Sequence, residues 1–157
     1  MNQQALQTGL ERLLHTDGVR ACALVESDSG LVWLAVGRVS SGGEDDATLW
    51  EAAMDYWRMY GRLRTHFVDA LGELGAAVMY HRRGVLALLP FGGQGLVLVC
   101  VAEHHGVDWS AWQRQARGLA GRAFHGGVLD PAVDLHLVGL LDQPAEVLAR
   151  VGEEVGD

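Results

Sequence analysis

Four neighbouring residues carry side chains that metal ions prefer. Glu103, His104, His105 and Asp108 directly follow an apolar run, and carboxylates and imidazoles are common ligands of transition metals. Adjacent side chains on an extended chain point to opposite sides, however, so a single ion cannot easily bind both histidines. We therefore interpret this segment as a solvated loop and predict no metal site.

A glycine-rich stretch and several serines are the other candidates for catalytic chemistry. Gly92, Gly93 and Gly95 join two strand-like runs and do not open a helix, and the chain contains no lysine; this excludes a Walker-type phosphate loop. No serine has the strand–turn–helix context of a nucleophile elbow. We predict a turn at 92–95, no catalytic residues and no cofactor, so the protein is not expected to be an enzyme.

Composition narrows the class of partner. The chain has 157 residues, 49% of them hydrophobic, and a formal net charge of -8, so binding to nucleic acid is not expected. The start of the chain lacks a signal-peptide pattern, and the apolar runs 85–89 and 96–101 are too short to cross a bilayer. We predict a cytoplasmic protein without a membrane partner. Cys22 and Cys100 lie in apolar runs, which favours buried, reduced thiols over a disulfide.

Hydrophobic periodicity and turn residues predict one α/β (α+β) domain followed by a tail. Thr48 and Glu51 match a capping box at the start of a long helix, and Pro144 suits the first turn of a short helix at 144–151. In chain order, the other expected elements are a helix ending near 16–18, a hairpin of Val19–Glu26 and 31–37, a helix over Ala47–Leu71, strands at 75–82, Gly84–Phe91 and 95–102, and a helix capped by Asp108 that runs to Phe124.

The long helix and the strand at 75–82 carry the candidate binding residues. The helix has two apolar stripes, Leu49, Ala53, Tyr56, Tyr60, Leu63, Phe67 and Leu71 on one side and Trp50, Met54 and Trp57 on the next. One sheet cannot cover so wide an apolar arc, and the 75–82 strand mixes small and polar residues as edge strands do. We predict a dimer or partner interface at Trp50, Met54, Trp57, Gly75, Ala77, Val78, Met79 and Tyr80. The alternative is that the Trp50 stripe fills the core of its own protomer.

With these elements in this order, the sequence resembles the roadblock family, which is named after a dynein light chain. The matching pieces are the leading LERLL helix, the hairpin GVRACALVESDSGLVWLAVG, the helix beginning ATLWEAA, the paired runs GVLALLPFGGQGLVLVCVAE and the helix ending at Phe124. The resemblance covers residues 1–125 and leaves 126–157 as a C-terminal extension. It implies a five-stranded antiparallel sheet in the order 2-1-5-4-3 with helices on both faces, a profilin-like arrangement.

The resemblance also implies a function. Roadblock-type proteins form homodimers or heterodimers through their third strands and second helices, and some bacterial members act beside a gliding-polarity GTPase. We therefore predict a non-catalytic dimeric regulator or scaffold, with itself or a related roadblock-type chain and a Ras-like small GTPase as partners. The alternative is a ligand-sensing domain of the GAF or PAS kind, in which Trp33, Tyr80 and Phe91 line a pocket.

Overall fold

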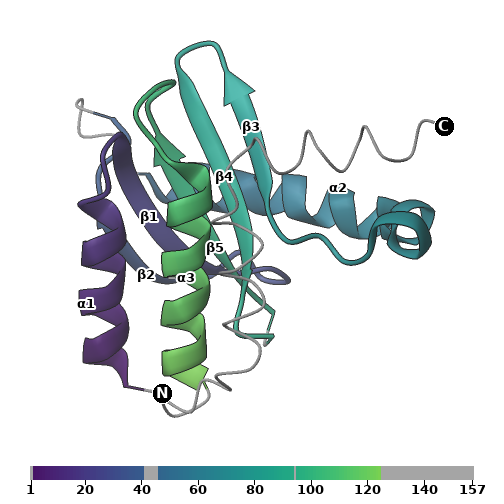
Figure 1. The fold of residues 1–157 in the computed structure, drawn as a ribbon, viewed down its shortest axis with the longest axis horizontal. Helices are drawn as coiled ribbons and strands as arrows, with labels where there is room; N and C mark the ends of the chain where they lie inside the picture. The colour runs from purple at the N-terminus through teal and green to yellow at the C-terminus, as the bar shows by residue number, and fades with distance from the viewer. Residues whose placement is uncertain (1, 41–45, 94, 125–157) are drawn as a thin grey trace, which may run out of the picture.

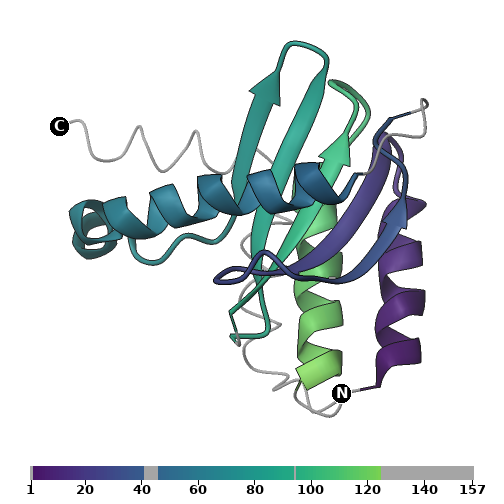
Figure 2. The ribbon, with the colours of Figure 1, turned by 180° about the vertical axis from the view of Figure 1, so that it is seen from behind.

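The computed structural model describes residues 2–40, 46–93 and 95–124. Its elements, in chain order, are α1 (Gln3–Leu14), β1 (Val19–Glu26), β2 (Val32–Gly37), α2 (Ala47–Leu71), β3 (Ala77–His81), β4 (Gly84–Phe91), β5 (Leu96–Ala102) and α3 (Trp109–Phe124). The strands form one antiparallel sheet in the order β2-β1-β5-β4-β3, which confirms the predicted order. The helices lie on both faces, with α1 and α3 on one and α2 on the other (Figures 1 and 2).

The sheet separates two hydrophobic cores. Because side chains alternate along a strand, β1 directs Cys22 and Leu24 toward α1 and α3, and Ala23 and Val25 toward α2. Every residue of β5 is buried, and β4 is buried from Val85 to Leu89. The two strands are almost wholly apolar because helices cover both of their faces, as the sequence predicted.

Local signals account for most helix ends. The Asn2 side chain accepts hydrogen bonds from the amides of Gln4 and Ala5 at the start of α1. Gly18, with φ 83°, turns the chain between α1 and β1. The Asp108 carboxylate accepts a bond of 3.0 Å from the Ala111 amide, as a helix cap does.

The capping box predicted for α2 is wrong. The helix already includes Ala47, so Thr48 lies inside its first turn, and Asp46 occupies the cap position. The Asp46 side chain makes no cap bond to the helix and instead accepts a bond of 2.9 Å from the amide of Val39. The carboxylate at the start of α2 therefore holds the end of the β2 segment against the helix.

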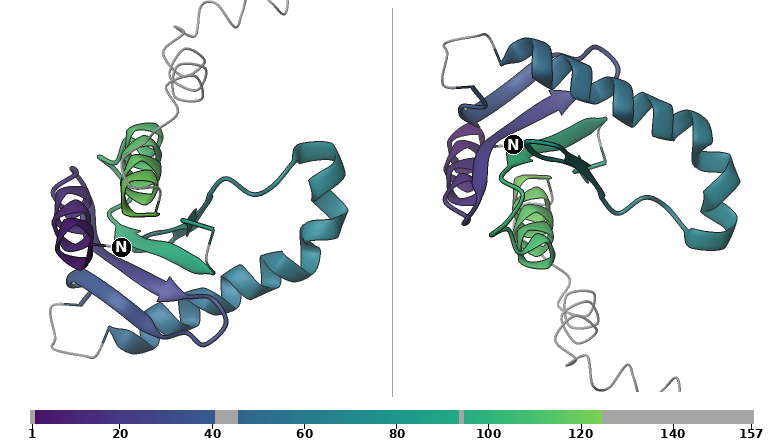
Figure 3. Two further views of the ribbon diagram at one scale, coloured as in Figure 1. Left: turned by 90° about the horizontal axis from the view of Figure 1, so that it is seen from below. Right: turned by 90° about the horizontal axis from the view of Figure 1, so that it is seen from above.

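α2 is much longer than the sheet is wide. Its 25 residues give a length of about 37 Å, whereas five strands span about 19 Å across the sheet. Because α2 crosses the strands, its C-terminal half continues beyond β3, and the chain then returns to form that strand (Figure 3).

The C-terminal extension and the absence of a membrane span can be compared with the structure only in part. The predicted extension 126–157, including the expected helix at 144–151, lies outside the described residues, so the boundary at 125 remains a prediction. Among the residues that the structure describes, no helix is long and apolar enough to span a bilayer.

Candidate protein-interaction surface

The two halves of α2 have different surroundings. Trp50, Ala53 and Met54 are buried against the sheet with exposures of 3%, 1% and 0%. From 61 to 71 every residue is exposed except the half-buried Val68. The N-terminal half is thus a core helix, whereas the C-terminal half lacks a layer beneath it in the described part of the chain.

The exposed part of α2 carries a continuous apolar row. The large hydrophobic side chains exposed on α2 recur at intervals of three or four residues, which places them on one helical face. We call this row the α2 stripe, and it consists of Tyr56, Met59, Leu63, Phe67 and Leu71, all at least 38% exposed. A contiguous exposed apolar row of this kind is typical of a protein-interaction site.

An open sheet edge lies beside the α2 stripe. β3 pairs with β4 alone, through Ala77–Leu88 to His81–Gly84, so its other edge has no strand among the described residues. Alternation places Ala77 and Met79 on the α2 face, whereas Val78 packs with the other core and Tyr80, the neighbour two residues on, is 66% exposed. The free backbone groups of such an edge can pair with another strand.

Two hollows lie between α2 and the sheet, next to the α2 stripe. One, of about 190 Å³, lies between α2 and β3 and is lined by Trp57, Leu63, Leu74 and Met79 among others. The other, of about 290 Å³, lies on the opposite side of Tyr56, has mostly apolar walls and includes Arg20, His81 and Arg83 in its lining. Tyr56 contributes to both hollows, and its ring meets that of His81 edge-on at 6.2 Å.

The structure separates the predicted interface residues into two groups. Trp50 and Met54 fill the core of their own protomer, so the interface predicted at these two side chains is corrected in favour of the alternative that the sequence left open. Trp57 is half-buried at the 190 Å³ hollow. The remaining residues lie on or just before the open edge, with Gly75 and Tyr80 exposed and Ala77, Val78 and Met79 half-buried.

The sequence prediction missed Met59 as a surface residue and did not assign Leu63, Phe67 or Leu71 to the interface. The available signal was the length of the helix: a 25-residue helix exceeds the width of a five-stranded sheet. Its second half therefore had to extend past the sheet, together with whichever apolar side chains it carried.

Two arginines of α2 bind within the chain. Arg58 donates hydrogen bonds of 3.0 and 3.1 Å to the carbonyls of Ser27 and Asp28, which attaches the β1–β2 turn to α2. Arg64 forms an ion pair with Glu73 just beyond the helix. Arg58 and Arg64 are therefore bound to other parts of the chain, whereas a surface arginine is usually only solvated.

The acidic residues of the suspected metal segment have structural partners. Glu103 forms an ion pair of 3.3 Å with Arg20, and Asp108 caps α3. The rings of His104 and His105 are 6.2 Å apart and tilted by 54°. Within the residues that the structure describes, no three metal-ligating side chains are grouped.

Two further predictions have clear outcomes. Gly92, Gly93 and Gly95 form the turn between β4 and β5, as predicted, with Gln94 outside the described residues. The lining proposed for a ligand-sensing pocket is wrong, because Trp33 on β2 and Tyr80 on β3 lie at opposite edges of the sheet. Phe91 is buried among α1 and α3 side chains, where its ring meets Phe124 edge-on.

The two cysteines face each other across neighbouring strands. Cys22 of β1 and Cys100 of β5 are register partners, both fully buried and both free. The hydrogen bond with Cys22, followed by burial, raises the pKa of the Cys100 thiol far above its usual value. The prediction that both thiols are buried is confirmed.

Comparison with known proteins supports the fold. No family model and no curated protein matches the sequence. A Roadblock/LC7 domain from Streptomyces avermitilis superposes with a TM-score of 0.61 at 17% identity, over 78% of this chain and 95% of that one. The chain has the Roadblock/LC7 fold. The gliding protein MglB from Thermus thermophilus has a TM-score of 0.63 at 16% identity, with 79% and 91% covered.

A further MglB structure, described as having a tetrameric arrangement, has a TM-score of 0.58 at 16% identity, with 78% of this chain and 91% of that chain covered. At such low identity these likenesses show the fold alone. In this chain, the Roadblock/LC7 fold places the α2 stripe and the β3 edge next to each other on one side of the molecule.

Proposed function

We propose that this Roadblock/LC7-fold protein is a non-catalytic, dimeric regulator or scaffold of a Ras-like small GTPase or a related signalling complex in the bacterial cytoplasm. The observation that carries the proposal is the α2 stripe beside the open edge of β3. Exposed apolar rows and unpaired strand edges are both features that proteins cover by association.

A second copy of this chain, or a related roadblock-type chain, fits this surface. Two copies of β3 can pair edge to edge about a two-fold axis, which would extend the antiparallel sheet across both protomers. The same axis would bring the C-terminal halves of two α2 helices toward each other, because each extends past its own β3 (Figure 3). The tetrameric arrangement described for an MglB structure supports self-association in this fold.

The regulatory role is supported by the resemblance to the roadblock family and by the fold shared with the gliding protein MglB. The hollow on the far side of Tyr56 adds a surface for the second partner, since Arg83 and His81 lie beside apolar walls there, whereas the third basic residue of the lining, Arg20, is already paired with Glu103. An apolar depression with basic groups at its rim suits an acidic protein surface.

Light scattering tests the dimer. At tens of micromolar, the protein is expected to have about twice the chain mass of 17.0 kDa. Leu63→Arg places a charge in the middle of the α2 stripe and should shift the protein toward monomer. Leu31→Arg is the matched control, because Leu31 is 60% exposed in the β1–β2 turn and lies outside the stripe. A wild-type monomer, or equal effects of both variants, would contradict the proposed interface.

The GTPase role requires a separate measurement. The purified dimer is added to a Ras-like small GTPase from the same organism, loaded with GTP or with GDP, and complex formation and the rate of GTP hydrolysis are measured. We expect nucleotide-dependent binding and a changed hydrolysis rate, both reduced by Arg83→Glu without loss of the dimer. Absence of binding in both nucleotide states would remove the GTPase from the proposal and leave the dimer standing.

A further inference from the structure

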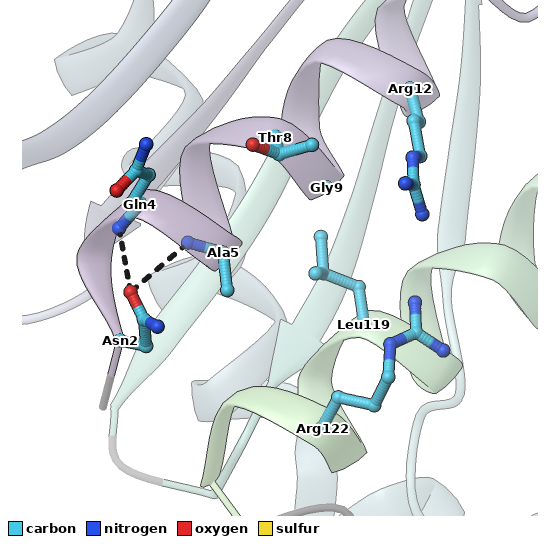
Figure 4. A pocket seen from close by; sticks show the side chains of 8 residues that line it. All are labelled: Asn2, Gln4, Ala5, Thr8, Gly9, Arg12, Leu119 and Arg122. Carbon is cyan, nitrogen blue, oxygen red and sulfur yellow. Dashed lines mark hydrogen bonds between the residues drawn. The ribbon is translucent and has the colours of Figure 1, made fainter.

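A second candidate surface lies on the other face of the sheet, between α1 and α3. Two adjoining hollows, of about 390 and 260 Å³, follow the line where these helices meet. Both are lined by Gly9, Arg12, Leu119 and Arg122, and the larger is shown in Figure 4. We call the two hollows together the α1–α3 groove.

The groove concentrates positive charge. Arg12 comes from α1, and Arg114 and Arg122 come from α3. No aspartate or glutamate is among the described residues that line either hollow. Within the described part of the chain, none of the three guanidinium groups has an ion pair, in contrast to Arg20, Arg58 and Arg64. Unpaired positive charge in a chain of net charge -8 indicates an anionic partner.

Apolar side chains form part of the floor of the groove, between the polar ones. Leu13 and Leu119 are almost fully buried along it, with 2% and 4% exposure, and Ala5 extends this floor toward the start of α1. A small inorganic anion would use only the arginines. A segment that carries both acidic and apolar side chains would use the walls and the floor together.

We propose that residues 126–157 of the same chain dock in the α1–α3 groove. This segment contains seven of the twenty acidic residues of the chain but only one of its twelve arginines. It also contains Val147, Leu148 and Val151 at helical spacing, between Glu146 and the pair Glu153 and Glu154. Its composition therefore matches the groove in both charge and apolar content.

The place where α3 ends also favours this segment. α3 ends at Phe124, two residues after Arg122, so the chain continues from the end of the groove that contains Asn2 and Arg122 (Figure 4). The 12 residues of α1 correspond to about 18 Å, which an extended chain spans with about six residues. Tethering also gives the segment a local concentration in the millimolar range, so a weak contact is sufficient.

This docking is independent of the proposed dimer and of the GTPase, because the groove lies on the face of the sheet opposite α2 (Figures 1 and 2). The test uses the full chain with Ala149→Cys carrying a nitroxide spin label. Cys22 and Cys100 are fully buried, so the label attaches at the new site in the folded protein. Paramagnetic broadening of backbone amide signals in NMR spectra then reports which residues the labelled segment approaches.

We expect the amide signals of Thr8, which lines the larger hollow, and of Gln115, which lines the smaller one, to lose most of their intensity. Those of Met59 and Phe67 on α2 should keep theirs. Replacing Arg12, Arg114 and Arg122 with glutamate should restore the groove signals, and replacement with glutamine should restore them in part. The matched control Arg38→Glu with Arg62→Glu alters two exposed arginines outside the groove and should leave the broadening in place.

Broadening within one molecule is distinguished from broadening between molecules by mixing spin-labelled protein with isotope-enriched protein that carries no spin label. Broadening that arises only between molecules would assign the groove to a second copy and overturn the proposal. Unchanged Thr8 and Gln115 signals, or broadening that persists in the glutamate variant, would overturn it as well. The intact signals of the core strands in each variant show that the fold is retained.

Discussion

Gly9 of α1 lies directly against Leu119 of α3. A Cβ atom built on Gly9 would be 2.1 Å from Leu119 Cδ1 and 2.8 Å from Cδ2, distances that no pair of non-bonded carbon atoms tolerates. The two helices approach each other closely at this point because glycine leaves room for the leucine. The α1–α3 groove opens on either side of the same contact.

Gly9→Ala should therefore destabilise the protein, although alanine is the better helix former. Overpacking at the helix contact should lower the free energy of unfolding by about 1–3 kcal/mol. Gly61→Ala is the matched control, because Gly61 lies inside α2 and an added Cβ would have nothing within 4 Å. That substitution should raise stability by about 0.5–1 kcal/mol. Denaturant titrations measure both, and a stabilising Gly9→Ala would refute the close contact.

Arg58→Met should loosen the β1–β2 turn. The variant keeps an unbranched, largely apolar stem but loses the guanidinium group that donates hydrogen bonds to the Ser27 and Asp28 carbonyls. Stability should fall by about 1 kcal/mol, and hydrogen exchange at the Gly30 amide, which donates to the Glu26 carbonyl, should become faster. Arg62→Met, at an exposed position on the same helix, should change neither. Equal exchange in both variants would show that Arg58 does not hold the turn.

Trp50→Ala should act on stability, whereas Phe67→Ala should act on association. Trp50 is 3% exposed in the core, so its truncation should cost about 3–5 kcal/mol of unfolding free energy. Phe67 is 45% exposed on the α2 stripe, so its truncation should weaken the dimer and leave the stability of the monomer nearly unchanged. Thermal unfolding and light scattering on both variants separate the two effects. A weakened dimer in folded Trp50→Ala alone would restore the interface predicted at the tryptophan.

The paired cysteines should be inert in the folded protein. A thiol reagent at pH 8 should modify neither Cys22 nor Cys100 until the protein unfolds, because both side chains are fully buried. In addition, the hydrogen bond with Cys22 and burial raise the pKa of the Cys100 thiol. The raised pKa stabilises the fold below the pKa of the unfolded thiol, about 8.5, and this contribution is lost as the pH rises further. Denaturant titrations at pH 7 and pH 10 should show lower stability at pH 10, with a smaller difference in Cys100→Ala. Rapid modification of the native protein would contradict this account.

Much of the fold was predictable because its signals are local. The apolar runs of Gly84–Phe91 and of β5, the turn at 92–95 and the aspartate before α3 each specify an element from neighbouring residues alone. The strand order required the resemblance to the roadblock family, since turns and periodicity leave several antiparallel orders open. The cap of α2 was predicted two residues too late, at Thr48, because Asp46 binds Val39 across a loop, a contact that local sequence cannot reveal.

The candidate site was only partly predictable for a geometric reason. Both apolar stripes of α2 are visible in the sequence, but which of them meets the sheet depends on the rotation of the helix and on where it leaves the sheet. Trp50 and Met54 have the composition of an interface, yet they belong to the same core as the small residues Ala21 and Ala23 of β1. Leu63 and Phe67 are surface residues because they belong to the C-terminal half of α2, which continues beyond the sheet (Figure 3).

In the proposed dimer, the overhang of α2 couples the order of the helix to assembly. Three turns of helix without tertiary packing are marginally stable in water. Of residues 61–71 of α2, only Val68 is partly buried in the described part of the chain. A partner that covers the α2 stripe would therefore stabilise the helix on which the stripe is built. Dilution would then act on this protein as a mild and local denaturant, lowering its helical content at concentrations where the sheet and its two cores stay intact.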